Sequence, residues 1–334
     1  MMDWTDRHCR YFLRGFSPAT LLYTEMITAA AVTRGNTQRL LAFDPEEHPV
    51  ALQLGGSDPG ELATAARIGE AFGYDEINLN CGCPSDRVAS GAFGACLMRE
   101  PQRVAECVAA MVAAVRIPVT VKMRIGVVSG ARREVAGALA GFEEDEFAAL
   151  QAFVALMRRA GSQAAIVHAR VAVLGGLSPK ENREVPPLRY AVVRRLKAAM
   201  PDTPIVLNGG VRTVPSALDA LSWCDGVMLG REVYHRPLFL AQLAQALTPR
   251  TVTPSREALL TRMAGYAERQ LAAGHSLPAI TRHMLGLYAG EAGARAYRRL
   301  MSEGARAPGA DAQVIRRAAA SALEARGGAH ERSR

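Results

Sequence analysis

The sequence has no apolar run near the 18 residues that a membrane-spanning helix needs. It also lacks the features of a secretory signal peptide, since Met1-Met2-Asp3-Trp4-Thr5-Asp6 is polar almost at once. Its six cysteines, at positions 9, 81, 83, 96, 107 and 224, show no disulfide-like framework. These absences argue against an integral membrane protein and a disulfide-stapled secreted one. They predict a cytoplasmic protein in a reducing environment.

A metal centre also has little support. Cys81 and Cys83 could form half of a zinc site, but no second pair of Cys or His lies nearby at ligand spacing.

Aromatic residues make up only 6% of the chain and hydrophobic residues 49%, which is usual for a globular protein. A chain of 334 residues can bury one barrel-sized domain and a smaller second domain. We therefore expect two domains, no metal ion and no membrane contact.

Short aliphatic runs alternate with amphipathic segments from residue 20 to about residue 240. The expected strands are Thr20–Thr24, Val50–Leu54, Glu76–Leu79, Pro118–Met123, Ala164–Val167, Ile205–Leu207 and Gly226–Leu229. The expected helices include Pro59–Phe72, Pro101–Val115, Glu143–Arg159, Leu188–Met200 and Pro215–Leu221. Because strands that alternate with helices form parallel βαβ units, this pattern predicts an α/β fold, a (β/α)8 TIM barrel.

This barrel pattern is one strand short of the eight that close a (β/α)8 barrel. Met1–Trp4 and the helix-like segment Asp6–Leu13 have the character of the loop and helix that follow a first strand. We expect the missing strand to precede Met1. The alternative, a barrel open at one edge, is less favoured because an open seam would expose unpaired backbone groups.

Each expected strand is followed by polar or small residues. In a barrel the loops at the C-terminal strand ends converge on one face, where active sites form. These loops are Thr24–Met26, Gln53–Gly56, Asn80–Ser85, Lys122–Arg124, His168–Arg170, Asn208–Gly210 and Gly230–Arg231. The last two follow consecutive strands and suit phosphate, because glycine lets backbone N–H groups approach an anion closely. An isolated Gly-Gly pair, by contrast, is more often only a turn.

Three of these loops carry side chains that could take part in catalysis or ligand binding. Cys81-Gly82-Cys83-Pro84 places a thiol just past a strand end, although a buried structural pair is the alternative. Lys122 could hold a negative charge, form a Schiff base, or only extend to the surface. His168 could act as an acid, a base or a hydrogen-bond donor, or be structural. Their convergence on one face favours functional roles.

The last quarter of the chain is helical and basic. After a linker at Thr248–Pro254, helices are expected at Arg256–Ala272, Pro278–Tyr288, Ala292–Glu303 and Ala312–Arg326. From Thr251 onward, 13 Arg against 7 acidic residues give +6 of the chain's net +8. Arg295, Arg298 and Arg299 lie at i, i+3 and i+4 and so share one helix face. Such a face is either a solvated surface or a contact for a polyanion such as nucleic acid.

Five motifs, in this order, resemble those of the tRNA-dihydrouridine synthases. They are Met1–His8, Asn78–Ser85, Lys122–Gly126, Ser178–Arg183 and Asn208–Gly210, and the likeness covers nearly the whole chain. The most similar subgroup is the A type, which acts on D-loop uridines 20 and 20a. The resemblance implies an FMN-binding TIM barrel over residues 1–247 and a small all-α, tRNA-binding domain over residues 255–326. We expect residues 327–334 to be a disordered tail, and the protein to be a monomer that uses NADPH as reductant.

The same resemblance implies roles for single residues. Cys83 matches the family's catalytic proton donor. Flavin contacts are implied for Met1, Met2, Gln53, Lys122 and His168, and the phosphate grip for Asn208, Gly209, Gly210, Gly230 and Arg231. Contacts with tRNA are implied for Asn80, Lys180, Arg183, Arg295 and Arg298. The chain departs from the family at Cys81, where Val is usual, and at Val171 and Val173, where Lys and Trp are common in the subgroup.

The implied reaction reduces the C5=C6 bond of uracil, with a hydride to C6 from reduced FMN and a proton to C5 from Cys83. One alternative is an FMN barrel of the dihydroorotate or dihydropyrimidine dehydrogenase kind, acting on a free pyrimidine. The basic C-terminal domain argues against it, because a small substrate gains nothing from such a domain. Another alternative is a flavin-free tRNA-binding chaperone, for which Cys83 would be dispensable.

Overall fold

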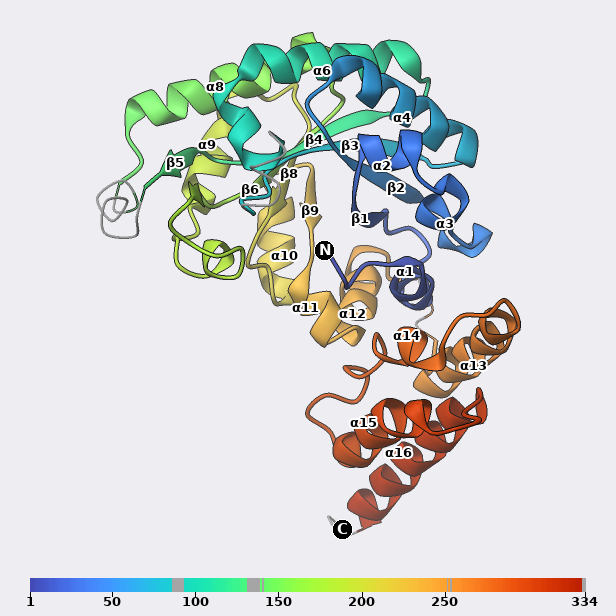
Figure 1. Ribbon diagram of the computed structural model, residues 1–334. Helices are drawn as coiled ribbons and strands as arrows, with labels where there is room; N and C mark the ends of the chain where they lie inside the picture. The colour runs from blue at the N-terminus through green and yellow to red at the C-terminus, as the bar shows by residue number, and fades with distance from the viewer. Residues whose placement is uncertain (86–92, 131–138, 140, 251, 253, 332–334) are drawn as a thin grey trace. The chain divides into compact units, whose positions relative to one another are not determined.

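A computed structural model describes residues 1–85, 93–130, 139, 141–250, 252 and 254–331, with the backbone alone from 326 to 331 (Figure 1). The chain folds into two compact units. The barrel unit comprises Leu21–Phe43 and His48–Leu229. The helical unit comprises Met1–Thr20, Asp44–Glu47 and Gly230–Arg334.

The barrel unit is built on one parallel sheet of seven strands (Figure 1). The strands, in spatial order, are β1 (Leu22–Thr28), β2 (Val50–Gly55), β3 (Glu76–Cys81), β4 (Val119–Arg124), β6 (Ala165–His168), β8 (Ile205–Asn208) and β9 (Gly226–Met228). The sheet curls as in a (β/α)8 barrel, with β1 and β9 at its edges. The α/β barrel class predicted from the sequence is thereby confirmed, and so are its seven strands.

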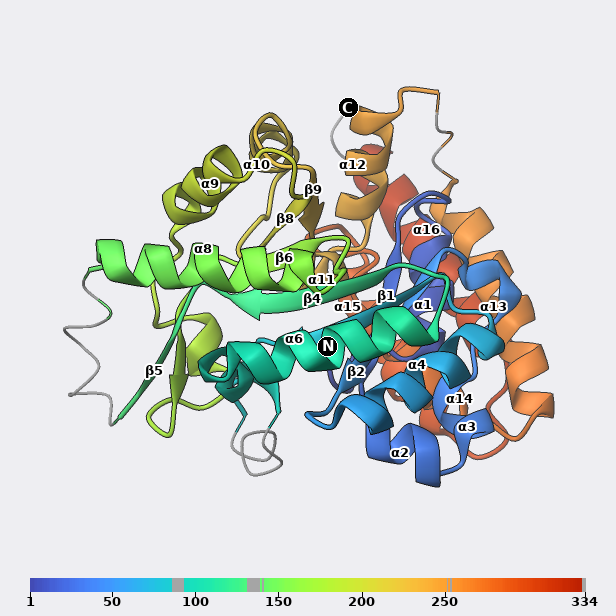
Figure 2. The same ribbon diagram turned by 90° about the horizontal axis from the view of Figure 1, so that it is seen from above.

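Helices cover the outer face of the curled sheet (Figure 2). They are α2 (Ala29–Arg34), α3 (Thr37–Leu41), α4 (Pro59–Phe72), α6 (Pro101–Ala114), α8 (Glu144–Arg159), α9 (Tyr190–Ala199) and α10 (Val214–Leu221). At Gly69, α4 approaches the sheet so closely that an added Cβ would lie 2.6 Å from Cδ2 of Leu52. Leu52, Ile77 and Val121 are completely buried between helices and sheet, and burial of such side chains is the main stabilising term of the fold.

Two features of the barrel unit differ from the sequence prediction. β1 continues to Thr28, whereas we predicted a loop at Thr24–Met26; the strand has a register shift between Tyr23 and Met26, so its polar residues lie on a bulge. A second, two-stranded parallel sheet pairs β5 (Val127–Ser129) with β7 (Ala172–Leu174). Strands of three residues are too short to show a period in the sequence.

The helical unit packs α1 (Arg7–Arg14) and the 3-10 turn η1 (Pro45–Glu47) with the C-terminal helices. The latter are α11 (Arg231–His235), α12 (Leu238–Leu247), α13 (Arg256–Ala272), α14 (Leu277–Thr281), α15 (Ala294–Ser302) and α16 (Gln313–Glu331), with a 3-10 turn, η4, at Gly304–Arg306. Asp6 caps α1 by accepting a hydrogen bond from the Cys9 N–H at 3.0 Å. The buried rings of Tyr11 and Tyr266 stack with their centroids 3.9 Å apart and so join α1 to α13. The all-α character predicted for the C-terminal part is confirmed.

Three details of the C-terminal prediction change. α14 ends at Thr281, not Tyr288, and gives way to turns where a Cβ on Gly286 would lie 2.2 Å from the His235 carbonyl oxygen. α16 continues to Glu331 and so includes part of the tail that we predicted to be disordered. The predicted linker Thr248–Pro254 contains residues 251 and 253, which lie outside the described residues.

The division into units does not coincide with the predicted domain boundaries. The segment from Gly230 to Leu247 belongs to the helical unit, as do Met1–Thr20. The role of residues 1–247 as a flavin domain and of residues 255–326 as a tRNA-binding domain stays a prediction.

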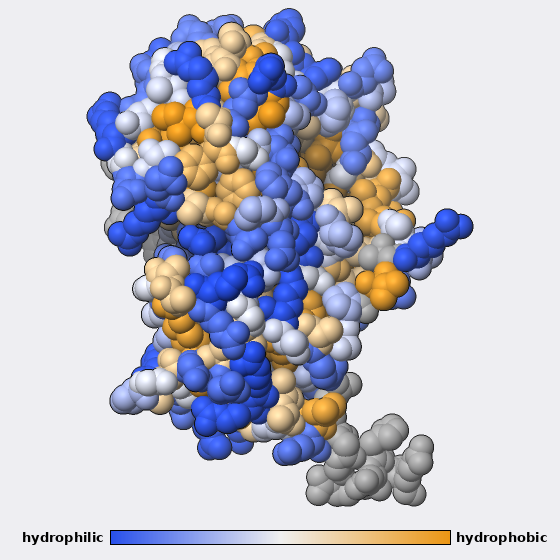
Figure 3. Space-filling view, turned by 90° about the vertical axis from the view of Figure 1, so that its right-hand side faces the viewer, coloured by the Kyte–Doolittle hydropathy of each residue, from blue (hydrophilic) through white to orange (hydrophobic). Residues whose placement is uncertain are grey.

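The outer surface is mixed in polarity. On the face shown in Figure 3, hydrophilic residues are spread over the surface with hydrophobic residues scattered between them. Searching the described residues for a helix with the length and apolarity to cross a membrane gives no candidate.

Candidate active site

The polar residues predicted at the strand ends of the barrel unit are neighbours in the sheet. Strand pairing places Asn80 opposite Lys122, Arg124 opposite His168, and His168 opposite Asn208. These residues lie at or next to the C-terminal ends of β3, β4, β6 and β8. The sheet thus brings side chains from distant parts of the sequence to one edge.

A chain of hydrogen bonds joins polar side chains on three adjacent strands. Gln53 Nε2 donates to Asn78 Oδ1 at 2.8 Å, and Asn78 Nδ2 donates to Thr120 Oγ1 at 2.8 Å. The Thr120 hydroxyl donates to Glu76 Oε1 at 2.6 Å. Asn78, Thr120 and Glu76 are buried, where an unsatisfied polar group would be costly. These hydrogen bonds therefore fix the orientation of the Gln53 side chain before any ligand binds.

Asn80 holds the turn that carries Cys83. Its Oδ1 accepts hydrogen bonds from the N–H groups of Gly82 and Cys83, both at 3.0 Å. Its Nδ2 donates to Gln53 Oε1 at 2.8 Å, and the residue is buried. The structure thus gives Asn80 a positioning task within the protein. The tRNA contact predicted for it would have to use its second Nδ2–H.

The two cysteines of the turn differ in environment. Cys81 is fully buried at the end of β3, and burial raises the pKa of its thiol. Cys83 is half-buried, and its carbonyl oxygen accepts a hydrogen bond from the Ala95 N–H at 2.9 Å. This bond ties the turn to the 3-10 helix η2 (Gly94–Arg99). Cys81 therefore behaves as an apolar core residue, while Cys83 is partly exposed.

Lys122 lies half-buried on β4. Burial, together with the like charge of Arg124, lowers its pKa to about 8, while Cys83 acts in the opposite direction. The amine therefore exchanges between ammonium and neutral forms close to neutral pH. Such a group can donate a hydrogen bond and hold a developing negative charge, which is the first of the roles proposed from the sequence.

His168 lies beside the glycine turn that follows β8. Gly209 and Gly210 have φ values of +108° and +72°, which favour glycine. A Cβ on Gly209 would lie 3.1 Å from His168 Nε2, so the imidazole packs against the turn. The Tyr190 hydroxyl donates to the Gly209 carbonyl oxygen at 2.6 Å, and Asn208 Nδ2 donates to the Met228 carbonyl oxygen at 2.8 Å. The turn is held from two sides, and its glycine backbone stays accessible.

Arg124 belongs to this site, although the sequence suggested no role for it. The side chain is buried, with 3% of the residue exposed. Its Nε donates to the Gly82 carbonyl oxygen at 3.1 Å, and its Nη1 donates to the carbonyl oxygens of Asn182 at 3.1 Å and Val171 at 3.4 Å. Arg124 therefore connects the Cys83 turn to the loop after β7. In the sequence, Arg124 was part of the strand-end loop Lys122–Arg124 and of the motif Lys122–Gly126, but neither indicated its task.

The loop after β7 carries two of the predicted tRNA contacts, Lys180 and Arg183, on the 3-10 turn η3 (Glu181–Arg183) and just before it. Both side chains are exposed. Asn182 between them is buried: its Nδ2 donates to the Val173 carbonyl oxygen, and its Oδ1 accepts from the Val173 N–H, both at 2.8 Å. The backbone of this loop is thus fixed while its cations face solvent.

Four of the predicted flavin contacts, Met1, Met2, Gly230 and Arg231, belong to the helical unit. Met1 and Met2 are exposed, and a Cβ on Gly230 would lie 3.4 Å from Sδ of Met1. Arg231 is the first residue of α11. The Trp4 ring stacks on the Tyr234 ring of α11 at 4.4 Å, which holds the N-terminal segment against this helix. The structure groups the predicted flavin contacts in two sets, these four and the six of the barrel unit.

Helix α15 carries an exposed cluster of three arginines, Arg295, Arg298 and Arg299. Among the described residues none of the three has an ion-pair partner, whereas Arg256 pairs with Glu291 and Arg316 with Glu268. Like charges at i, i+3 and i, i+4 destabilise a helix by a few tenths of a kcal/mol per pair, about 0.2–0.5. A polyanionic ligand would offset this repulsion.

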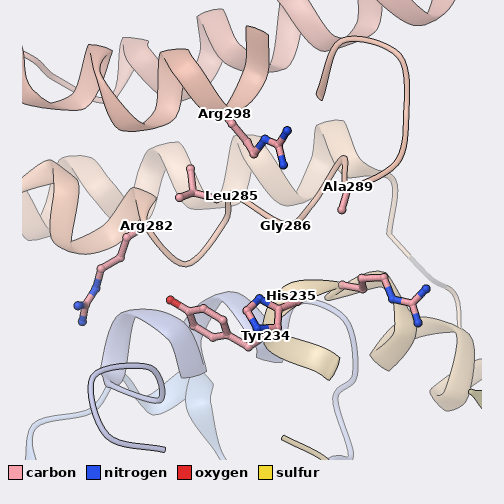
Figure 4. Close-up of a pocket in the computed structure, with 8 residues that line it drawn as sticks. Tyr234, His235, Arg282, Leu285, Gly286, Ala289 and Arg298 are labelled. Atoms are coloured by element: carbon pink, nitrogen blue, oxygen red, sulfur yellow. The ribbon is translucent and has the colours of Figure 1, made fainter. Parts of the chain in front are cut away.

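Arg298 also borders an open cavity of about 530 Å³ in the helical unit (Figure 4). The cavity is lined by Tyr234, His235, Arg236, Arg282, Leu285, Gly286, Ala289 and Arg298. In Figure 4, Arg298 extends from its helix toward Leu285 and Ala289, with Tyr234 and His235 on the opposite side. Arg282 and Arg236 pair with Asp6 and Glu232, respectively. This cavity was not predictable from the sequence, because its residues come from three separate segments.

In the part of the chain that the structure describes, no group of three or more His, Cys, Asp or Glu side chains could hold a metal ion.

Comparison with known proteins identifies the family. The family model described as dihydrouridine synthase (Dus) matches residues 1–324. The chain belongs to the dihydrouridine synthase family. The resemblance seen in the sequence motifs is thereby confirmed.

Three relatives of this dihydrouridine synthase family member show how far the similarity extends. The chain is 54% identical over 318 residues to the tRNA-dihydrouridine(20/20a) synthase of Xanthomonas axonopodis pv. citri, with 95% of this chain and 91% of that protein covered. It is 53% identical over 303 residues to the synthase of the same name from Pseudomonas aeruginosa, covering 90% and 87%. With the synthase of that name from Vibrio cholerae it shares 49% identity over 322 residues, covering 96% and 94%.

The donors of the barrel unit suit the flavin expected for a dihydrouridine synthase. Gln53 on β2, Lys122 on β4 and His168 on β6 present N–H groups, and a flavin ring carries oxygen and nitrogen acceptors along one edge. The positive φ values of Gly209 and Gly210 form the kind of backbone that can approach a phosphate. The residues present therefore fit FMN in their chemistry.

Proposed function

We propose that this protein reduces uridines 20 and 20a in the D loop of tRNA to dihydrouridine, using FMN as cofactor and NADPH as reductant. The observation that carries the proposal is the half-buried Cys83 thiol on a turn clamped by Asn80, next to Lys122, in a chain of the dihydrouridine synthase family. The names of relatives at 49–54% identity support the substrate and the positions.

When bound, FMN would supply the hydride that adds to uracil C6, after reduction by NADPH. The protein supplies the proton. The S–H bond of Cys83 breaks, a C–H bond forms at C5, and the thiolate left behind recovers a proton from water. A neutral thiol on a fixed turn is a suitable general acid, and general acid catalysis commonly contributes about 10²–10⁴-fold to a rate.

The neighbouring donors would bind the uracil and flavin edges. Electron density moves onto C5 and the uracil carbonyl oxygens as the hydride adds, so Lys122 in its ammonium form and His168 would stabilise that charge. Gln53 is held by Asn78 and Asn80 on its two amide ends and is thus oriented in advance. Pre-orientation lowers the cost of reaching the reactive geometry.

The exposed cations would bind the RNA. The exposed cations are Lys180 and Arg183 in the barrel unit and Arg295 and Arg298 in the helical unit. Among the described residues, Lys180, Arg295 and Arg298 form no ion pair with a carboxylate. Such contacts follow the shape and charge of the backbone. The target base has to leave the tRNA stack to reach a barrel, so base flipping is expected. We propose a monomer acting in the cytoplasm, where tRNA and NADPH are found.

The test is direct. Purified protein is incubated with FMN, NADPH and unmodified tRNA, and dihydrouridine is mapped along the D loop by mass spectrometry. We expect modification at positions 20 and 20a, none without NADPH, and at least about 100-fold slower modification with a Cys83→Ala variant. Dihydrouridine at other positions would overturn the assignment of the site of modification.

Two other functions would give different results. A reductase of free pyrimidines would act on uracil or orotate, and the basic α15 would serve no purpose in it. A flavin-free tRNA chaperone would bind tRNA equally well with Cys83→Ala and would form no dihydrouridine.

A further inference from the structure

Arg124 is a buried cation held by carbonyl oxygens alone. Its three hydrogen bonds go to the backbone of Gly82, Asn182 and Val171, at 3.1–3.4 Å. Within the described residues no carboxylate lies within 4.0 Å of it to form an ion pair. A buried charge usually needs an opposite charge to balance its loss of hydration. Among the described residues, the guanidinium beside the Cys83 turn therefore has no carboxylate as a counter-charge.

The charged neighbours of Arg124 are also cations. Lys122 shares β4 with it, Arg170 follows β6, and Arg183 belongs to η3. The charge of Arg124 lowers the pKa of Lys122, and the charges of Arg170 and Arg183 lower the pKa of Arg124. Burial is the main cause that lowers the pKa of Arg124 to about 10. The remaining contribution that raises this pKa comes from Cys83.

Among the described residues, Cys83 acts electrostatically on two cations of β4, Lys122 and Arg124. Cys81 on β3 and Cys96 on η2 are both thiols whose pKa is raised by burial. Arg99, at the end of η2, is a further cation. Cys83 is thus a half-buried thiol whose charge would act on the cations Lys122 and Arg124.

We propose that Arg124 is a positioning residue that balances the charge of Cys83 once the thiol has given its proton to the substrate. This inference rests on the proposed function, in which Cys83 is the proton donor. The guanidinium holds the Gly82 carbonyl oxygen, one peptide before Cys83, so its charge and its grip on the turn act at the same point. The same side chain donates a hydrogen bond to the Asn182 carbonyl oxygen, so one residue positions both the Cys83 turn and the Lys180–Arg183 segment.

The proposal is tested by the pH profile of Cys83 alkylation. Purified wild type, Arg124→Gln and Arg124→Lys are treated with iodoacetamide across a pH series, and labelling of the Cys83 peptide is followed by mass spectrometry. Gln can still donate to Gly82 but carries no charge, while Lys keeps the charge. We expect the midpoint of the profile to move up by about one pH unit in Arg124→Gln and to stay near the wild-type value in Arg124→Lys.

Arg14 offers a matched control, because it is also buried and donates to backbone carbonyl oxygens, those of Glu47 and Ser17. Arg14→Gln removes a comparable clamp from the helical unit and should leave the Cys83 profile unchanged. If Arg124→Gln does not fold, Arg124→Met is the neutral comparison, since it fills the volume of the aliphatic stem.

The outcomes separate the inference from the function it rests on. An unchanged profile in the neutral variant, or an equal shift with Lys and Gln, would overturn charge compensation. Alkylation needs no tRNA, so this measurement tests the role of Arg124 independently of the reaction. An active Cys83→Ala variant would overturn the proposed function instead. With tRNA, Arg124→Gln should lower kcat about tenfold at unchanged KM, and Arg124→Lys should recover part of the loss.

Discussion

The two units of this protein use charge and hydrogen bonding in opposite ways. In the barrel unit, Gln53, Asn78, Asn80 and Thr120 are buried or half-buried and joined by bonds of 2.8 Å or close to it. In the helical unit, the arginines of α15 are exposed and have no ion pair in the described part of the chain. In the proposed function, the buried network positions the reacting groups and the exposed arginines of α15 bind RNA. Buried networks fix atoms to within tenths of an ångström, whereas exposed cations act at a distance and are screened by salt.

The largest expected effect is on Cys83. Cys83→Ala should lower the rate of dihydrouridine formation by at least about 100-fold, because the general acid is lost. Cys81→Ala is the control: it removes a buried thiol of raised pKa, so stability should fall while the reaction continues. Rates are measured under saturating tRNA, with unfolding followed by circular dichroism. A comparable loss of rate in both variants would mean that the turn, rather than the Cys83 thiol, was affected.

Asn80 tests whether position matters as much as the thiol. Asn80→Ala leaves the N–H groups of Gly82 and Cys83 without their acceptor, and an unsatisfied buried group costs about 1–3 kcal/mol. We expect a rate about tenfold lower, with Asn80→Asp closer to wild type because it keeps an acceptor oxygen. Pre-steady-state rates decide the matter. Wild-type rates in Asn80→Ala would show that the turn keeps its shape without the clamp.

Gly210 tests the phosphate turn. Gly210→Ala puts a Cβ 2.3 Å from Cδ1 of Leu188 at a φ of +72°, so it combines strain with a clash. Gly175→Ala has a φ of +76° but nothing within 4 Å, so it carries the strain alone, about 1 kcal/mol. We expect only Gly210→Ala to lose flavin, measured as the ratio of flavin to protein absorbance. Equal flavin content in the two variants would separate this turn from cofactor binding.

The arginines of α15 should produce a smaller effect that depends on salt. Replacing Arg295 and Arg298 together with Gln should weaken tRNA binding severalfold and reduce the slope of log K against log salt by about 1.4–1.8. Arg316→Gln is the control, since Arg316 pairs with Glu268. Binding is measured by filter retention at several salt concentrations. An unchanged slope in the double variant would remove α15 from the RNA contact.

The smallest effect concerns pH. The pKa of Lys122 is about 8 in the folded protein, below its ordinary 10.5, so the unfolded chain binds more protons between these values. The free energy of unfolding should therefore rise as pH increases from about 8 to 10.5, and Lys122→Met should abolish this rise. If the ammonium form is the active one, kcat should fall about twofold on reaching pH 8. A rate that is flat from pH 7 to 9 would contradict that role.

Much of the fold could be read from the sequence, because each strand and helix has its own local period. Helices such as Pro59–Phe72 and Arg256–Ala272 begin and end where the pattern placed them. β1 was misjudged, since a bulge carries Thr24 and Glu25 without ending the strand. The convergence of Lys122 and His168 followed from the barrel class. Arg124 could not be interpreted, because its partners at Gly82 and Asn182 lie 42 and 58 positions away in the sequence and are backbone atoms.

The visible absorption spectrum of the purified protein tests the central claim most directly. We expect flavin bands that NADPH bleaches and that unmodified tRNA restores, while free uracil and orotate do not. Restoration by a free pyrimidine would contradict the tRNA assignment. A folded protein that binds tRNA but shows no flavin bands, even after incubation with FMN, would contradict the reductase itself.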